Sequence, residues 1–236
     1  RHTRCLSDWS SDVCSSDLAW NTLLFSLEVK KGEKIVTAST EFGSNVVSLQ
    51  SLAERSGAEL VILDVQENGY IDIQELSQHI DERLKLVALS HAPAHCGSVI
   101  NAKQIGEWLH DSDAFFVLDA CQTLGQFDVS VEEIGCDALV ATGRKWLRGP
   151  RGTGFLFASD HMVEALKPIS VDLANADWLP EPKSGSHISY FKKAQRLQTW
   201  ERSMAGQLGL TNAIEEYITL NNDGNITNEI HKNRSI

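Results

Sequence analysis

Short runs of apolar residues, each about the length of a strand, recur along most of this chain. Six such runs stand at residues 33–39, 58–65, 84–91, 114–120, 137–142 and 153–158. The run at 114–120 begins AFFVL and then reaches a single acid. An unbroken apolar run of this length is typical of a strand covered on both faces. The pattern therefore predicts five or six core strands.

Segments with helical character separate these runs. They lie at residues 20–29, 44–56, 72–79 and 101–113. Gly57 follows the second segment and is expected to end that helix, because glycine readily adopts the left-handed conformation found at helix C-termini. Asp72 is expected to cap the third helix. Strands that alternate with helices predict an α/β fold, with a mainly parallel sheet flanked by helices. The last strand follows only a short turn and could be antiparallel.

Residues with distinct chemistry follow two consecutive predicted strands. Asp119 ends the first strand, Gln122 comes shortly after it, and Lys145 lies on a loop just past the next strand. Ligands bind at the carboxyl ends of strands in open α/β sheets, so these three side chains can converge at one edge. An acid for a pyridine nitrogen, a donor for a ring oxygen and an amine for a Schiff base are what a protein needs to hold pyridoxal 5'-phosphate (PLP).

The loop around Lys145 is basic. Arg144 and Arg148 flank the lysine and could hold a phosphate, with Thr142 adding a hydroxyl. Taken alone, Asp119 could equally be a helix-capping aspartate, and the loop could be a solvated basic surface. The placement of acid, amide and amine after consecutive strands favours the cofactor site.

Three short segments together resemble the motif block of one family. They are DACQ at 119–122, TGRK at 142–145 and GPRGTG at 149–154. In this combination the chain resembles the class V aminotransferase family of fold-type I PLP enzymes, over roughly residues 19–226. That family includes cysteine desulfurases, selenocysteine lyases and isopenicillin N epimerase-like proteins.

The resemblance implies a role for each residue of the motif block. Asp119 would contact the pyridine nitrogen and Gln122 the ring hydroxyl. Lys145 would form the Schiff base with PLP and then move protons. Thr142 and Arg144 match positions that bind the cofactor phosphate.

Two upstream segments also resemble parts of this family. Residues 39–60 match the segment that covers the cofactor face, where Phe42 could stack on the pyridine or be an ordinary core residue. Residues 90–101 match a loop near the ring oxygen, where His95 could contact cofactor or substrate, or simply be a loop histidine.

The resemblance implies an enzyme that acts on a small amino-acid substrate through Lys145. The reaction would be a lyase elimination, at a C–S bond or a related one, or an amino transfer. The full-length protein would be a homodimer. One alternative is a truncated, catalytically incompetent fragment of such an enzyme. Another is a non-enzymatic α/β module for a different phosphate ligand, although GPRGTG at 149–154 matches neither a P-loop nor a GxGxxG fingerprint.

The ends of the chain differ from its middle. Residues 1–18 repeat SSD without an apolar period and are expected to be a non-native or disordered leader. Residues 19–226 would form a partial PLP-binding large domain, and 227–236 a truncated start of a C-terminal region, with the small C-terminal domain largely missing. Residues 167–190 predict a long loop, and residues 196–220 resemble the family's return into the sheet and its exit helix.

Composition narrows the classes of function. A chain of 236 residues can bury one sizeable core. Its net charge of −11 argues against a nucleic-acid partner, and the absence of a long apolar run argues against a membrane span. No CxxC or His/Cys spacing suggests a metal site. These features suit a cytoplasmic enzyme. Cys96, Cys121 and Cys136 are expected to be free, buried cysteines.

Overall fold

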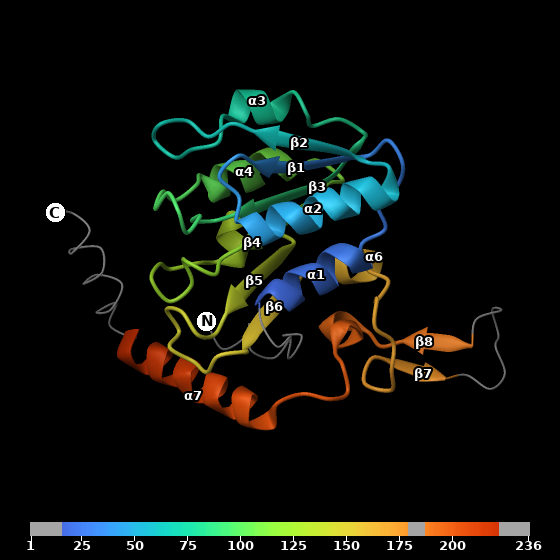
Figure 1. The fold of residues 1–236 in the computed structure, drawn as a ribbon, viewed down its shortest axis with the longest axis vertical. Helices are drawn as coiled ribbons and strands as arrows, with labels where there is room; N and C mark the ends of the chain where they lie inside the picture. Colours follow the sequence, from blue (N-terminus) through green and yellow to red (C-terminus); the bar gives the residue numbers. More distant parts are fainter. Residues whose placement is uncertain (1–15, 179–186, 222–236) are drawn as a thin grey trace.

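The computed structural model describes residues 16–178 and 187–221 as a layered α/β fold built on one main sheet (Figure 1). The strands of that sheet are β1 Lys34–Ala38, β2 Glu59–Leu63, β3 Leu84–Ser90, β4 Phe115–Asp119, β5 Ala138–Thr142 and β6 Gly154–Ala158. Each lies within one of the apolar runs, so all six predicted strands are confirmed.

The sheet has the order β2-β1-β3-β4-β5-β6. Strands β1 to β5 pair in parallel with their neighbours, whereas β6 pairs antiparallel with β5. The mainly parallel sheet is therefore confirmed, and so is its antiparallel last strand. The parallel strands direct their carboxyl ends to a single edge.

Helices cover both faces of the sheet (Figure 1). Their bounds are α1 Ser16–Ser26, α2 Gly43–Ser56, α3 Ile73–Ser77, α4 Ala102–Leu109, α5 Val131–Ile134, α6 Asp160–Ala165 and α7 Met204–Asn221, with a 3₁₀ helix η2 at Lys193–Leu197. Helices α1, α2 and α6 share one hydrophobic core with the sheet. Helices α3, α4, α5 and α7 contribute to a second core.

Strand β4 shows why two cores form. Phe115 and Val117 face the first core, whereas Phe116 and Leu118 face the second. All four side chains are buried, because successive residues of a strand point to opposite faces and both faces are covered. This strand ends at Asp119, whose carboxylate lies at the edge formed by the carboxyl ends of the parallel strands.

The expected helix signals are present. Gly57 has a φ of 75° and donates its backbone N–H to the carbonyl of Ala53, which ends α2. The Asp72 side chain accepts a hydrogen bond from the backbone N–H of Gln74 and caps α3.

Helix α1 departs from its predicted range of 20–29. It begins at Ser16, within the expected leader, and ends at Ser26. It stops there because Leu27 forms an antiparallel bridge with Leu166. Residues 1–15 of the expected leader lie outside the described residues, as does the expected C-terminal region at 227–236.

The predicted long loop at 167–190 is wrong in part. Strands β7 Ala176–Trp178 and β8 Ile188–Tyr190 pair antiparallel as a separate two-stranded sheet, while 179–186 lie outside the described residues. Strands of three residues carry no apolar run of their own and become visible only when paired. The expected return into the sheet after residue 196 is also wrong, since the described part of this segment forms η2 and α7.

Candidate functional site

The carboxyl ends of β1, β3, β4 and β5 gather the polar residues that carry chemistry. Glu41 follows β1, Ser90 closes β3 with His91 directly after it, Asp119 closes β4, and the turn holding Lys145 follows β5. Parallel pairing forces these ends together, so residues far apart in sequence meet at one edge.

Asp119 is held by one donor on each carboxylate oxygen. Asn45 donates its Nδ2–H to Oδ2 over 2.9 Å, and the backbone N–H of Cys121 donates to Oδ1 over 2.9 Å. The side chain is buried. A buried carboxylate is costly unless hydrogen-bonded, and here both oxygens are.

Glu41 is a second buried carboxylate at the same edge. It accepts from the backbone N–H groups of Phe42 at 2.8 Å and Ser90 at 2.6 Å, from Asn45 Nδ2 at 2.9 Å, and from the Ser90 hydroxyl. Burial raises the pKa of the Glu41 carboxyl; hydrogen bonds from Ser90 and Asn45 oppose that rise, and the charge of Asp119 adds to it. Glu41 thereby ties the end of β1 to the end of β3.

His91 supports β4 from the neighbouring strand. Its backbone N–H donates to the Asp119 carbonyl over 2.9 Å. Its Nδ1 is hydrogen-bonded to Thr123 Oγ1 at 3.0 Å. Burial lowers the pKa of His91 to about 4, so the ring is neutral near neutral pH.

The turn after β5 presents Lys145. Gly143 donates its backbone N–H to the Thr153 carbonyl over 2.8 Å, and Gly149 donates to the Gly143 carbonyl over 2.7 Å. These bonds close the turn on itself. Lys145 lies within this turn and is half-buried.

Helix α7 covers this turn from outside. A Cβ on Gly143 would lie 2.8 Å from Leu210 Cδ1, and one on Gly149 would lie 2.9 Å from the same atom. The absence of side chains at both positions lets Leu210 pack directly on the turn. The position of Lys145 therefore depends on a helix from the far end of the described chain.

Gln122 is connected to the same turn. Trp146 donates its indole Nε1–H to Gln122 Oε1 over 3.2 Å. The amide carbonyl is thus occupied on the protein side, which leaves the Nε2–H groups as donors for a ligand.

The Cys121 thiol lies at the same edge of the sheet and is affected by the charges of both Asp119 and Lys145. Burial raises the pKa of the Cys121 thiol well above its usual value, and the Asp119 carboxylate adds to this rise. A hydrogen bond with Ser16 and the positive charge of Lys145 act in the opposite direction. The thiol therefore lies within electrostatic reach of both the predicted acid and the predicted amine.

The remaining predicted site residues lie around this centre. Thr142 is buried and donates its hydroxyl to the Thr153 carbonyl at 3.5 Å. Arg144 is exposed on the lysine turn. Phe42 is the N-cap residue of α2 and is 39% exposed, so it is not a core phenylalanine. His95 is exposed on the loop after β3.

The sequence interpretation missed three residues of the edge, namely Glu41, Asn45 and His91. Glu41 and His91 come soon after strands, and Asn45 lies in the first turn of the helix after a strand. These positions after strands were the signal in the sequence that could have identified them. The cysteine expectation also needs correction: Cys121 and Cys136 are free and buried as expected, but Cys96 is exposed on the loop after β3.

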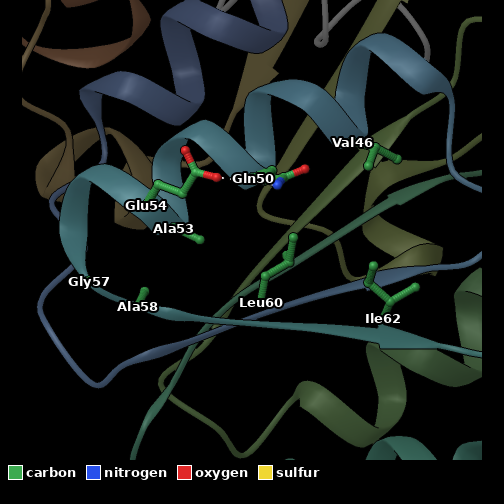
Figure 2. A pocket seen from close by; sticks show the side chains of 8 residues that line it. All are labelled: Val46, Gln50, Ala53, Glu54, Gly57, Ala58, Leu60 and Ile62. Atoms are coloured by element: carbon green, nitrogen blue, oxygen red, sulfur yellow. Dashed lines mark hydrogen bonds between the residues drawn. The ribbon is translucent and has the colours of Figure 1, made fainter.

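A separate surface hollow lies between α2 and β2 (Figure 2). Val46, Leu60 and Ile62 give it an apolar lining, and Gln50 donates to Glu54 over 3.2 Å at its side. It contains none of the residues of the strand-end edge, so the chemistry lies elsewhere.

Among the residues that the structure describes, no three His, Cys, Asp or Glu side chains gather as metal ligands would. Likewise, within 16–178 and 187–221, no helix is long and apolar enough to cross a membrane.

Comparison with known families decides the relationship. Residues 13–178 match the family model of aminotransferase class-V. The chain belongs to this family. The resemblance stated from the motif block is therefore confirmed, and so is the fold that it implied.

Similar curated proteins are cysteine desulfurases. A probable cysteine desulfurase of Methanothermobacter thermautotrophicus is 30% identical over 197 residues, which cover 84% of this chain and 48% of that protein. A cysteine desulfurase of an Enterobacter species is 27% identical over 196 residues, covering 83% and 47%. The chain thus spans about half the length of these relatives.

Solved structures show the same fold. An apo cysteine desulfurase from Thermococcus onnurineus superimposes with a TM-score of 0.80 at 24% identity, covering 89% of this chain and 52% of that one. A cystine C-S lyase, solved with its product cysteine persulfide, gives 0.77 at 19% identity, covering 88% and 55%.

Proposed function

We propose that this chain binds PLP and belongs to an enzyme that acts on an amino acid. Its reaction would be a lyase elimination at a C–S bond, or an amino transfer. The observation that carries the proposal is that Asp119 ends β4 and Lys145 follows β5, two adjacent parallel strands whose carboxyl ends share one edge of the sheet. Family membership and the desulfurase relatives support the same class of chemistry.

The residues at the edge fit the cofactor. A pyridine ring needs a buried acid beside its nitrogen, and Asp119 is buried with one fixed donor on each oxygen. A carboxylate oxygen has more than one acceptor direction, so both still have capacity for a ring N–H. When bound, PLP supplies an electron sink, and this is strongest with the ring nitrogen protonated.

Gln122 and Lys145 would hold the opposite side of the ring. Because Trp146 occupies Gln122 Oε1, the Nε2–H groups are the ones available to the ring hydroxyl. The Lys145 amine would attach the cofactor as a Schiff base and would later accept and return the substrate proton. Its half-buried turn, closed by Gly143 and Gly149, limits where that amine can reach.

The remaining predicted residues would complete the cofactor-binding site. We assign Thr142 and Arg144 to the phosphate, Phe42 to stacking on the ring, and His95 to the loop beside the ring oxygen. Phe42 is exposed at the start of α2, next to the Glu41 and Asn45 contacts, where a ring could lie against it. A cytoplasmic location and pairing of two full-length copies complete the proposal, and both rest on the family resemblance.

The proposal is tested by absorbance. Purified protein with added PLP is scanned from about 300 to about 500 nm before and after borohydride, and the reduced protein is digested and mapped. We expect a band near about 420 nm and a reduced label on Lys145. Lys145→Ala should lose both.

The matched control is Lys31→Ala. Lys31 is an exposed lysine in the turn before β1, at the opposite edge of the sheet. It should keep the band and the label. A wild-type protein without a band, or a label that persists in Lys145→Ala, would overturn the proposal. Because binding is read separately from turnover, loss of activity alone does not decide the outcome.

A further inference from the structure

Asn45 connects the two buried carboxylates of the strand-end edge. One nitrogen, Nδ2, donates to Glu41 Oε1 over 2.9 Å and to Asp119 Oδ2 over 2.9 Å. Glu41, Asn45 and Asp119 are 5%, 2% and 9% exposed, so water does not compete at this link. Each of the two hydrogens on this amide nitrogen therefore has its own acceptor.

Glu41 holds one side of the Asn45 amide in a fixed position. Its oxygens accept from the backbone N–H groups of Phe42, the N-cap residue of α2, and of Ser90, the last residue of β3. Backbone donors cannot rotate away, so the carboxylate is locked to two elements of the fold. Asn45 is therefore anchored at one hydrogen, and its other hydrogen points in a set direction.

That direction fixes the Asp119 carboxylate. Oδ1 is held by the backbone N–H of Cys121, and Oδ2 is held by Asn45. Rotation of the carboxylate about its last torsion would break both bonds at once. Donors to a charged acceptor are roughly twice as strong as neutral pairs, so this orientation is favoured.

We propose that Asn45 is a positioning residue for Asp119, anchored by Glu41, and that it orients the carboxylate toward the cofactor's ring nitrogen. This inference rests on the proposed function, since it requires PLP in the site. It adds a residue 74 positions upstream, on α2, to the part of the site that controls the ring nitrogen.

A purely structural role for Asn45 gives a different expectation. If Asn45 only docked α2 onto the sheet, its loss would weaken every ligand of the site alike. If it orients Asp119, its loss should weaken only ligands that have a ring nitrogen. A PLP analogue with carbon in place of that nitrogen separates the two roles.

The experiment measures equilibrium binding of PLP and of this carbon analogue to wild type and Asn45→Ala. We expect Asn45→Ala to lose about tenfold in PLP affinity and less than about twofold in affinity for the analogue. Ser48→Ala is the matched control, because Ser48 is buried one turn along α2 and accepts from Trp20 Nε1 over 3.0 Å without touching Asp119. It should change both affinities equally.

Each result decides the proposal. Equal losses for the two ligands in Asn45→Ala, or no loss, would overturn the positioning role while leaving the proposed function intact. No PLP binding by wild type would overturn the proposed function and this inference with it.

If Asn45→Ala does not fold, the wild-type protein supplies the readout. The Asn45 side-chain amide is followed by nitrogen-15 NMR during addition of each ligand. A shift with PLP but not with the carbon analogue supports the inference, and equal responses contradict it.

Discussion

Trp146 donates its indole N–H to the side-chain oxygen of Gln122 across 3.2 Å, which joins the turn after β5 to the turn after β4. Gln122 is half-buried and Trp146 is 44% exposed. The bond therefore contributes little to folding but sets which end of the amide faces the site.

Trp146→Phe tests whether this hydrogen bond orients the Gln122 amide without adding much to stability. Without the indole donor, the Gln122 amide can rotate, and its N–H groups lose their set direction. We expect about fivefold weaker PLP binding, and a free energy of unfolding within about 1 kcal/mol of wild type. Binding titrations and urea unfolding measure the two quantities. Trp108→Phe, at a comparably exposed tryptophan of α4, should change neither; a matching loss in both variants would contradict the assignment.

The sequence could place Asp119, Gln122 and Lys145 because each follows an apolar strand, and parallel strands end together. It could not place Asn45. The hydrogen bond from Asn45 to Asp119 spans 74 residues and depends on how α2 lies over the sheet. In the sequence, Glu41 and Asn45 look like ordinary polar residues at the start of a helix.

The choice between two histidines shows the same limit. The family resemblance favours His95, in the matched loop, yet His91 is the buried ring that contacts Thr123. His91 directly follows strand β3, whereas His95 lies further along the exposed loop. The position of His91 becomes fixed only when β3 pairs with β4 and Ser90 stands opposite Asp119.

Gly143→Ala should displace the turn that carries Lys145. The added Cβ would lie 2.2 Å from Thr153 Oγ1 and 2.8 Å from Leu210 Cδ1, so α7 or the turn must move. We expect a loss of about 1 to 3 kcal/mol in unfolding free energy and a weaker PLP band. Gly43→Ala is the control for stability, because a Cβ there meets nothing within 4 Å. Equal stability of the two variants would contradict the tight packing of the turn.

His91 should make the protein less stable as pH falls below neutrality. Burial holds its pKa at about 4 in the folded state, against about 6.5 when unfolded. Between these values the unfolded chain binds the extra proton, so the stabilisation is present above about pH 6.5 and is lost toward pH 4. From about pH 7 to about pH 5 the loss is roughly 2 kcal/mol.

Urea unfolding of wild type and His91→Gln at these two pH values measures the contribution. The variant should lose about 2 kcal/mol less than wild type on acidification. His110→Gln, at an exposed histidine of the α4 end, is the control for removing a histidine. A variant of His91 that keeps the full wild-type pH dependence would contradict the burial of a neutral ring.

Glu41 should act in the opposite direction. Its folded pKa is raised, so the folded state binds the proton more tightly than the unfolded state, and stability falls as pH rises through the window above about 4.3. Glu41→Gln removes this slope. It also places an amide where Phe42, Ser90 and Asn45 donate, which should cost about 1 to 3 kcal/mol.

The gap in stability between wild type and Glu41→Gln should therefore narrow as the pH rises. Urea unfolding across that range measures it, with Glu54→Gln, an exposed residue of α2, as the control for loss of a surface charge. A gap that widens with pH would show that Glu41 is stabilised as the anion.

The packing of Leu210 on the lysine turn has a consequence for the order in which the protein is made. Chains leave the ribosome from the N-terminus, so the N-terminal elements of a fold are made first. Every strand of the main sheet, with Asp119 and Gln122, is synthesised before α7. The turn that carries Lys145 is therefore complete only after α7 has been made. Under the proposed function, attachment of the cofactor aldehyde at Lys145 would belong among the last steps of maturation.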